Sequence, residues 1–130
     1  MTIKIGVLSE DLVRKRVMAI AKGRYLPKDG EPKIWFDSLT TLNEHLSSEV
    51  LHVLKVIREV KPESISDLCQ EAKRTIHDVN SSLQLLEGFG FVKLSKQSDT
   101  VTKPVLINAS FEIVYDLDLA LTLENLCLEG

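Results

Sequence analysis

Side chains suited to directional hydrogen bonding are concentrated between residues 73 and 84 of this 130-residue chain. A guanidinium donates two parallel hydrogen bonds, an amide donates and accepts at once, and hydroxyl and imidazole groups can do either. Together, such groups can recognise a surface that presents donors and acceptors in a fixed order. The set consists of Arg74, Thr75, His77, Asp78, Ser81 and Gln84, preceded by Lys73.

Two apolar rows at helical spacing indicate how these side chains are positioned. Residues at i, i+3, i+4 and i+7 line one face of a helix, so each row predicts a short helix with an inward face. The polar break at residues 73–75 separates the two helices by a tight turn. The inward positions are Ile65, Leu68, Cys69 and Ala72 in the first row, and Ile76, Val79, Leu83 and Leu86 in the second.

Capping residues bound the two predicted helices. Ser64 or Ser66 can cap the first, and Thr75 can cap the second, because their hydroxyls accept hydrogen bonds from first-turn N–H groups. Gly88 and Gly90 are expected to adopt left-handed conformations that end the second helix and turn the chain. A strand then begins at residue 91. The pattern is that of a helix-turn-helix running into a strand.

This segment resembles the winged-helix family of transcription regulators, broadly the multiple-antibiotic-resistance regulator type. In that family the second helix ends as leucine, glutamate, two residues, glycine and two apolar residues. The chain carries Leu86, Glu87, Gly88, Phe89, Gly90, Phe91 and Val92 at those places. The resemblance implies a recognition helix at about residues 75–87 and a wing at about 91–108.

The remaining elements extend this pattern at both ends. The predicted strands are 3–7, 33–36, 91–95, 105–108 and 111–119, the last pairing with 3–7 or 34–36; the wing tip is 96–103. The predicted helices are 9–22, 38–46 and one from residue 47 or 48 to Lys61 and Pro62. We therefore expect an α+β fold, with an N-terminal strand-helix extension (1–32), a winged helix-turn-helix domain (33–110) and a C-terminal strand and tail (111–130).

The predicted flanking strands restrict the resemblance to a smaller group within the winged-helix family. The strings PKIWFDSL and FEIVYDLDL, placed around the helix-turn-helix, are similar to those of small prokaryotic winged helix-turn-helix regulators. The similarity covers about residues 30–119 and implies double-stranded DNA as the partner. The family often has an arginine-rich turn and wing, whereas this chain has only Lys96 and Lys103 near the wing tip.

The helix-turn-helix geometry assigns roles to the polar set. The start of a recognition helix enters the major groove, which places Arg74, Thr75, His77 and Asp78 best for reading bases, with Ser81 and Gln84 further along. Asp78 either accepts from a cytosine amino group or pairs with Arg74, and we favour the pairing. Phosphate contacts are expected from Lys73, Arg74, Lys93, Lys96 and Lys103. The alternative interpretation is a face that is merely solvated.

The charge distribution leaves a second function open. The net charge is −3, yet residues 1–34 carry eight basic and four acidic side chains, and residues 104–130 carry five acidic and no basic ones. An acidic total disfavours strong nonspecific DNA binding. A winged-helix protein-interaction module, or an antitoxin-like autoregulator with a protein partner, is therefore the alternative to a transcription regulator.

Membrane proteins, disulfide-stabilised proteins, metalloproteins and enzymes are not expected, because the sequence lacks their characteristic patterns. No apolar run is long enough to cross a bilayer and no signal peptide is evident, so we expect a cytoplasmic protein. Cys69 and Cys127 do not make a disulfide framework, and His45, His52 and His77 lack metal-ligand spacing. No nucleophile elbow or phosphate-binding loop is present. We expect neither an enzyme nor a bound metal or cofactor.

A homodimer is expected, because one recognition helix reads too few base pairs for selective binding. The candidate interface consists of residues 9–22 and 111–128, which a minimal winged helix does not need. An equally good interpretation is that these residues cover the core of their own chain. The tail contributes Leu117, Leu119, Leu121, Leu123, Leu126 and Leu128.

Overall fold

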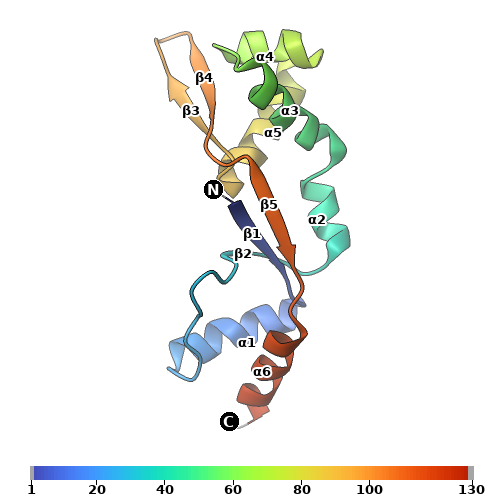
Figure 1. Ribbon diagram of the computed structural model, residues 1–130, viewed down its shortest axis with the longest axis vertical. Helices are drawn as coiled ribbons and strands as arrows, with labels where there is room; N and C mark the ends of the chain where they lie inside the picture. The colour runs from blue at the N-terminus through green and yellow to red at the C-terminus, as the bar shows by residue number, and fades with distance from the viewer. Residues whose placement is uncertain (1, 129–130) are drawn as a thin grey trace. The chain divides into compact units, whose positions relative to one another are not determined.

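The computed structural model describes the backbone of residues 2–128 and the side chains of residues 2–126, and over that range the chain is a mixed α+β protein (Figure 1). This confirms the expected class. The helices are α1 (Glu10–Ala21), α2 (Leu39–His45), α3 (Ser48–Val60), α4 (Ile65–Ala72), α5 (Ile76–Phe89) and α6 (Leu117–Leu128). The strands are β1 (Thr2–Val7), β2 (Ile34–Phe36), β3 (Val92–Lys96), β4 (Thr102–Leu106) and β5 (Ser110–Val114).

The chain divides into two compact units. The central unit consists of residues 43–110 with the first residues of the chain, and the terminal unit consists of residues 4–42 and those from Phe111 onward. Residues 33–42, which the sequence pattern placed with the central helices, therefore group with the terminal unit. Strand β2 explains this grouping, because it pairs in parallel with β1, Gly6 lying opposite Trp35.

The terminal unit combines a three-stranded sheet, in the order β2-β1-β5, with two helices. Ile5 and Val7 of the central strand are buried, as the alternating pattern predicts. Ser9 caps α1 as expected, its hydroxyl accepting from the Leu12 N–H at 3.3 Å. Helices α1 and α6 pack against each other (Figure 1). The tail thus covers its own unit, with Leu123 fully buried.

The expected strand over residues 111–119 is wrong beyond Val114. The chain turns there and α6 begins at Leu117. The Asp116 carboxylate accepts from the N–H groups of Asp118 and Leu119, at 3.0 and 3.1 Å, and so caps the helix. The leucines of the tail fit a strand period and a helix period alike, so the apolar pattern did not decide between the two.

A charged network ties α1 to the loop before β2. The Arg16 guanidinium donates to Glu31 at 2.8 Å, and the Tyr25 hydroxyl and the Lys28 N–H both donate to Glu31 at 2.9 Å. Burial alone would raise the pKa of Glu31, but these hydrogen bonds to its carboxylate outweigh burial and lower it. Burial, and then the bond to Glu31, raise the pKa of Tyr25 to about 12. The Arg16 guanidinium also lies 5.1 Å from the centre of the Trp35 ring.

The central unit consists of α3, α4 and α5, followed by the β3–β4 hairpin (Figure 1). Ser47, Ser64 and Thr75 cap the three helices, and each hydroxyl accepts a first-turn N–H. The hairpin strands are antiparallel and run over slightly different residues than expected, with residues 97–101 at the tip. The core of the unit includes Val53, Leu68, Val79, Leu83, Leu86 and Phe91, each no more than 1% exposed.

Two expectations about α5 require correction. Ile76 was expected to face the core but is 54% exposed, because it is the first residue of the helix and precedes the first full inward turn. Gly88 was expected to be left-handed but remains helical; only Gly90, with φ of 87°, ends α5 in that conformation. The Asn108 side chain donates to the Gly90 carbonyl at 2.7 Å, which fixes the base of the hairpin.

Candidate nucleic-acid interface

Four exposed residues of α5 form a polar stripe of about two turns that contains no carboxylate, lysine or arginine. Burial of Val79, Ser82, Leu83 and Leu86 turns the opposite side of the helix to solvent. Residues at i, i+3, i+4 and i+7 share one face, which here displays an imidazole, an amide, a hydroxyl and a second amide. The exposed residues are His77, Asn80, Ser81 and Gln84. Sequence reasoning missed Asn80, although its position three residues after His77 and four before Gln84 is a sufficient signal.

The first turn of α5 adds a hydroxyl, an apolar side chain and a carboxylate. Thr75 caps the helix by accepting from the Asp78 N–H at 3.2 Å, and both residues are exposed. Asp78 lies in the first turn, where a negative charge stabilises the positive end of the helix dipole. The carboxylate therefore has a role in helix stability that needs no pairing with Arg74. The exposed Ile76 provides apolar surface beside it.

Arg74 pairs with α3 instead of with Asp78. Its Nη1 lies 3.7 Å from Glu49 Oε2, and the Arg74 side chain is only 23% exposed. The expected Arg74–Asp78 pair is thus wrong, because the αL geometry of Lys73 directs the following residue back toward the helix packed against α4 and α5. Glu49 is 75% exposed, so the pair contributes no more than about 1 kcal/mol and can be exchanged for another anion.

The turn between α4 and α5 presents Lys73 to solvent. Lys73 ends α4 in the left-handed conformation, with φ of 56°, and its N–H bonds to the carbonyls of Cys69 and Gln70. Beside it lies an open depression of about 450 Å³ that Cys69, Arg74 and Asp78 also line. Burial raises the pKa of the Cys69 thiol, which keeps it protonated at neutral pH. The thiol therefore adds no negative charge to this surface.

The hairpin divides its lysines between two faces. Lys93 pairs with Val105 and Ser95 with Lys103, so Lys93 and Lys103 share one face of the ribbon, while Lys96 lies on the other. Lys93 and Lys96 are exposed. Lys103 is partly buried, with its Nζ 3.2 Å from Glu63 Oε2. Of the basic residues predicted to contact phosphate, Arg74 and Lys103 are therefore ion-paired within the chain.

The histidine and cysteine side chains were considered as metal ligands in the sequence, and the structure places those that it describes on separate elements. Among the side chains that the structure describes, no three histidine, cysteine, aspartate or glutamate residues lie close enough to hold a metal ion. His45, His52 and His77 belong to α2, α3 and α5 respectively. The side chain of Cys127 lies outside the described residues. Within residues 2–128, every helix is too short or too polar to cross a bilayer.

The HVO_A0114 family model matches residues 45–113, which is more than half of the chain. The chain belongs to the HVO_A0114 family. The match begins at the end of α2 and continues through α3, α4, α5 and the hairpin into β5, so the helices and hairpin that carry the candidate interface all lie within the HVO_A0114 region. No curated protein and no solved structure matches the chain significantly.

Proposed function

We propose that this protein is a winged-helix transcription regulator that binds double-stranded DNA in a sequence-specific manner. The supporting observation is the polar stripe of His77, Asn80, Ser81 and Gln84 on α5, the helix that follows a tight turn and precedes a lysine-bearing hairpin. In this proposal α5 is the recognition helix and the β3–β4 hairpin is the wing. Asn80 and Gln84 carry the amides that pair best with adenine, while Ile76 and Thr75 offer methyl groups to thymine.

Phosphate contacts in this proposal come from outside α5, which contains no lysine or arginine. Lys73 in the turn and Lys93 and Lys96 in the hairpin are exposed and have the reach for the backbone. Arg74 would join them by leaving Glu49. With so few cations, binding energy depends more on base contacts than is usual, and each good base contact contributes about 1–3 kcal/mol of discrimination.

We further propose that the regulator acts as a homodimer through its terminal unit. Val17 and Met18 of α1 are 59% and 52% exposed, and Leu117 and Leu121 of α6 are 65% and 56% exposed. Large apolar side chains grouped on two packed helices are typical of a subunit interface. Two copies would present two recognition helices to a two-fold symmetric site.

The second candidate function is a protein-interaction module, including an antitoxin-like autoregulator. The absence of basic residues from α5, together with the ion pairs of Arg74 and Lys103, favours it. A polar helix face can contact a protein as readily as a base edge. In that case the exposed face of α5 would bind a protein and no DNA sequence would be preferred.

Selection from random duplexes distinguishes the two functions. The full-length protein is incubated with the pool at low and at moderate salt, and the enriched sequences are tested with Gln84→Ala, Asn80→Ala and the control Asn43→Ala, which removes an exposed amide of α2. We expect a palindromic motif and a loss of about 5- to 150-fold in affinity for each α5 variant, but not for the control. Failure to enrich any motif at low salt would refute the DNA-binding proposal.

A further inference from the structure

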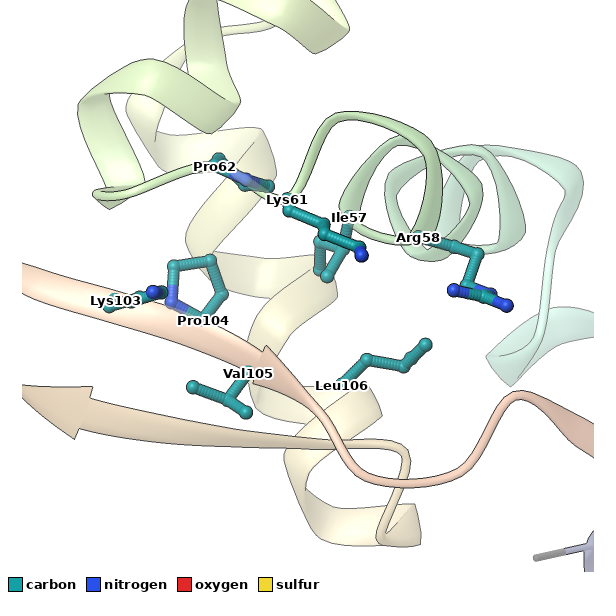
Figure 2. Close-up of a pocket in the computed structure, with 8 residues that line it drawn as sticks. All are labelled: Ile57, Arg58, Lys61, Pro62, Lys103, Pro104, Val105 and Leu106. Carbon is teal, nitrogen blue, oxygen red and sulfur yellow. The ribbon is translucent and has the colours of Figure 1, made fainter.

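A groove runs between the C-terminal end of α3 and strand β4, entirely within the central unit (Figure 2). Its volume is about 310 Å³, at the lower end of the range for pockets that hold small ligands. Four successive residues of β4 line it, so the groove meets the strand at its free edge. The lining residues are Ile57, Arg58, Lys61, Pro62, Lys103, Pro104, Val105 and Leu106.

The floor of the groove is apolar and its rim is cationic. Pro104 and Leu106 lie on the side of β4 toward Lys61 and Arg58, whereas the Val105 side chain points to the other side of the strand (Figure 2). Lys103, on the same rim, pairs with Glu63 at 3.2 Å. Within the described residues, Arg58 and Lys61 have no ion-pair partner. An apolar floor beside unpaired cations suits a molecule with an apolar body and one negative charge.

The end of α3 does not account for this charge by itself. A helix C-terminus carries about half of a negative charge, which basic residues in the last turn commonly offset. Arg58 lies in the last turn of α3, and Lys61 caps the helix with its N–H bonded to the Ile57 carbonyl. One cation is sufficient for the dipole. The left-handed conformation of Lys61, followed by Pro62, then holds a second cation at the groove.

We propose that this groove is a binding site for a small amphipathic anion, such as an aliphatic carboxylate. The carboxylate would lie between Arg58 and Lys61, and its hydrocarbon body would cover Ile57, Pro104 and Leu106. Hydrophilic anions such as inorganic phosphate or nucleotides fit less well, because they would leave the apolar floor exposed to water. The site is distinct from the face of α5, and the proposal does not depend on DNA binding.

The test compares octanoate with two probes of the same chain length, the octylammonium cation and neutral octanol, on the full-length protein without DNA. Binding is followed by isothermal titration calorimetry and by the NMR shifts of the methyl groups of Ile57, Val105 and Leu106. We expect octanoate to saturate the site and shift these methyls. Octylammonium is expected to bind at least tenfold more weakly, because two cations repel it.

Single substitutions test whether octanoate binds at the groove and whether the two cations contribute to its affinity. Arg58→Ala and Lys61→Ala should each weaken octanoate binding by up to about fivefold, the range for exposed ion pairs. Leu106→Glu, at a partly exposed position on the groove side of β4, places a carboxylate in the groove and should abolish binding without unfolding the protein. Lys33→Ala, which removes an exposed cation of the terminal unit, is the matched control.

Equal binding of octanoate and octylammonium would overturn the proposal, as would methyl shifts outside the groove or octanoate affinity that Leu106→Glu leaves unchanged. Circular dichroism of each variant verifies that its fold is intact. DNA binding is measured in a separate titration, so failure of the DNA-binding proposal would leave this result interpretable.

Discussion

Replacing Gly6 with alanine should destabilise the terminal unit, because Gly6 lies against the Trp35 indole. A Cβ at Gly6 would be 2.3 Å from both Cε3 and Cζ3 of Trp35, whereas ordinary contacts begin at 3.4 Å. The ring must therefore retreat by about 1 Å. Forcing a packed side chain to shift typically costs about 1–3 kcal/mol. Moving the indole away from Arg16 removes a cation–π contact worth about 0.5–1 kcal/mol.

Alanine also gains about 0.5–1 kcal/mol over glycine in a strand, because the unfolded chain is less flexible. The net expectation is a loss of about 1–3 kcal/mol in the free energy of unfolding. Denaturant unfolding followed by tryptophan fluorescence measures it, since Trp35 is the single tryptophan of the chain. Gly88→Ala is the matched control: its Cβ meets nothing within 4 Å in α5, so stability should rise by about 1 kcal/mol.

A Gly6→Ala protein as stable as the wild type would refute this reasoning. A second check is the double variant with Trp35→Leu, followed by circular dichroism. If the clash with the indole is the cause, Gly6→Ala should cost much less in that background than in the wild type. An unchanged cost would place the origin of the effect elsewhere.

Three further predictions concern the charged groups. Glu31→Gln should cost about 2–3 kcal/mol by leaving the partly buried Arg16 uncompensated, as measured by denaturant unfolding. Because the pKa of Glu31 is lowered in the folded state, its contribution to the free energy of unfolding should be present above pH about 4.5 and lost as the pH falls further. This pH dependence should be absent from Glu31→Gln. The pKa of Tyr25 is raised to about 12, so its contribution to the free energy of unfolding should be complete below pH about 10 and lost as the pH rises through about 12. The phenolate absorbance reports this titration, and Tyr25→Phe is the comparison. If the protein binds DNA as proposed, Glu49→Gln should free Arg74, tighten binding and steepen the salt dependence by about one phosphate contact, which a salt titration of affinity measures.

Local chemistry predicted most of the elements of the central unit. Ser64 and Thr75 cap the helices that they were expected to cap, because hydroxyl caps act within three residues and do not depend on distant packing. Gly90 ends α5 for the same kind of reason, since only its own backbone geometry is involved. The order of helices and strands over residues 47–106 therefore follows from short-range signals.

Features that depend on distant residues could not be predicted in the same way. The pairing of Arg74 with Glu49, and of Lys103 with Glu63, joins residues far apart in the sequence, and both pairs involve candidates for phosphate contact. A strand was expected at Leu117, where the structure has a helix. The sequence could not distinguish the two, because the apolar pattern of the tail fits both periods. The sequence thus indicated the candidate residues, but it did not indicate that two of the side chains expected to contact phosphate are ion-paired within the chain.

Helix α3 links the two proposed sites physically. Its first turn carries Glu49, which holds Arg74 beside the start of α5, and its last turn carries Arg58 beside the groove. Strand β4 forms the other wall of the groove and pairs with β3, which carries Lys93 and Lys96. An anion that draws α3 and β4 together would therefore act on both the turn and the hairpin. If it changes DNA affinity by some factor, DNA must change the affinity for octanoate by the same factor, because linkage is reciprocal. A factor of one in both titrations would show that the two sites are not coupled.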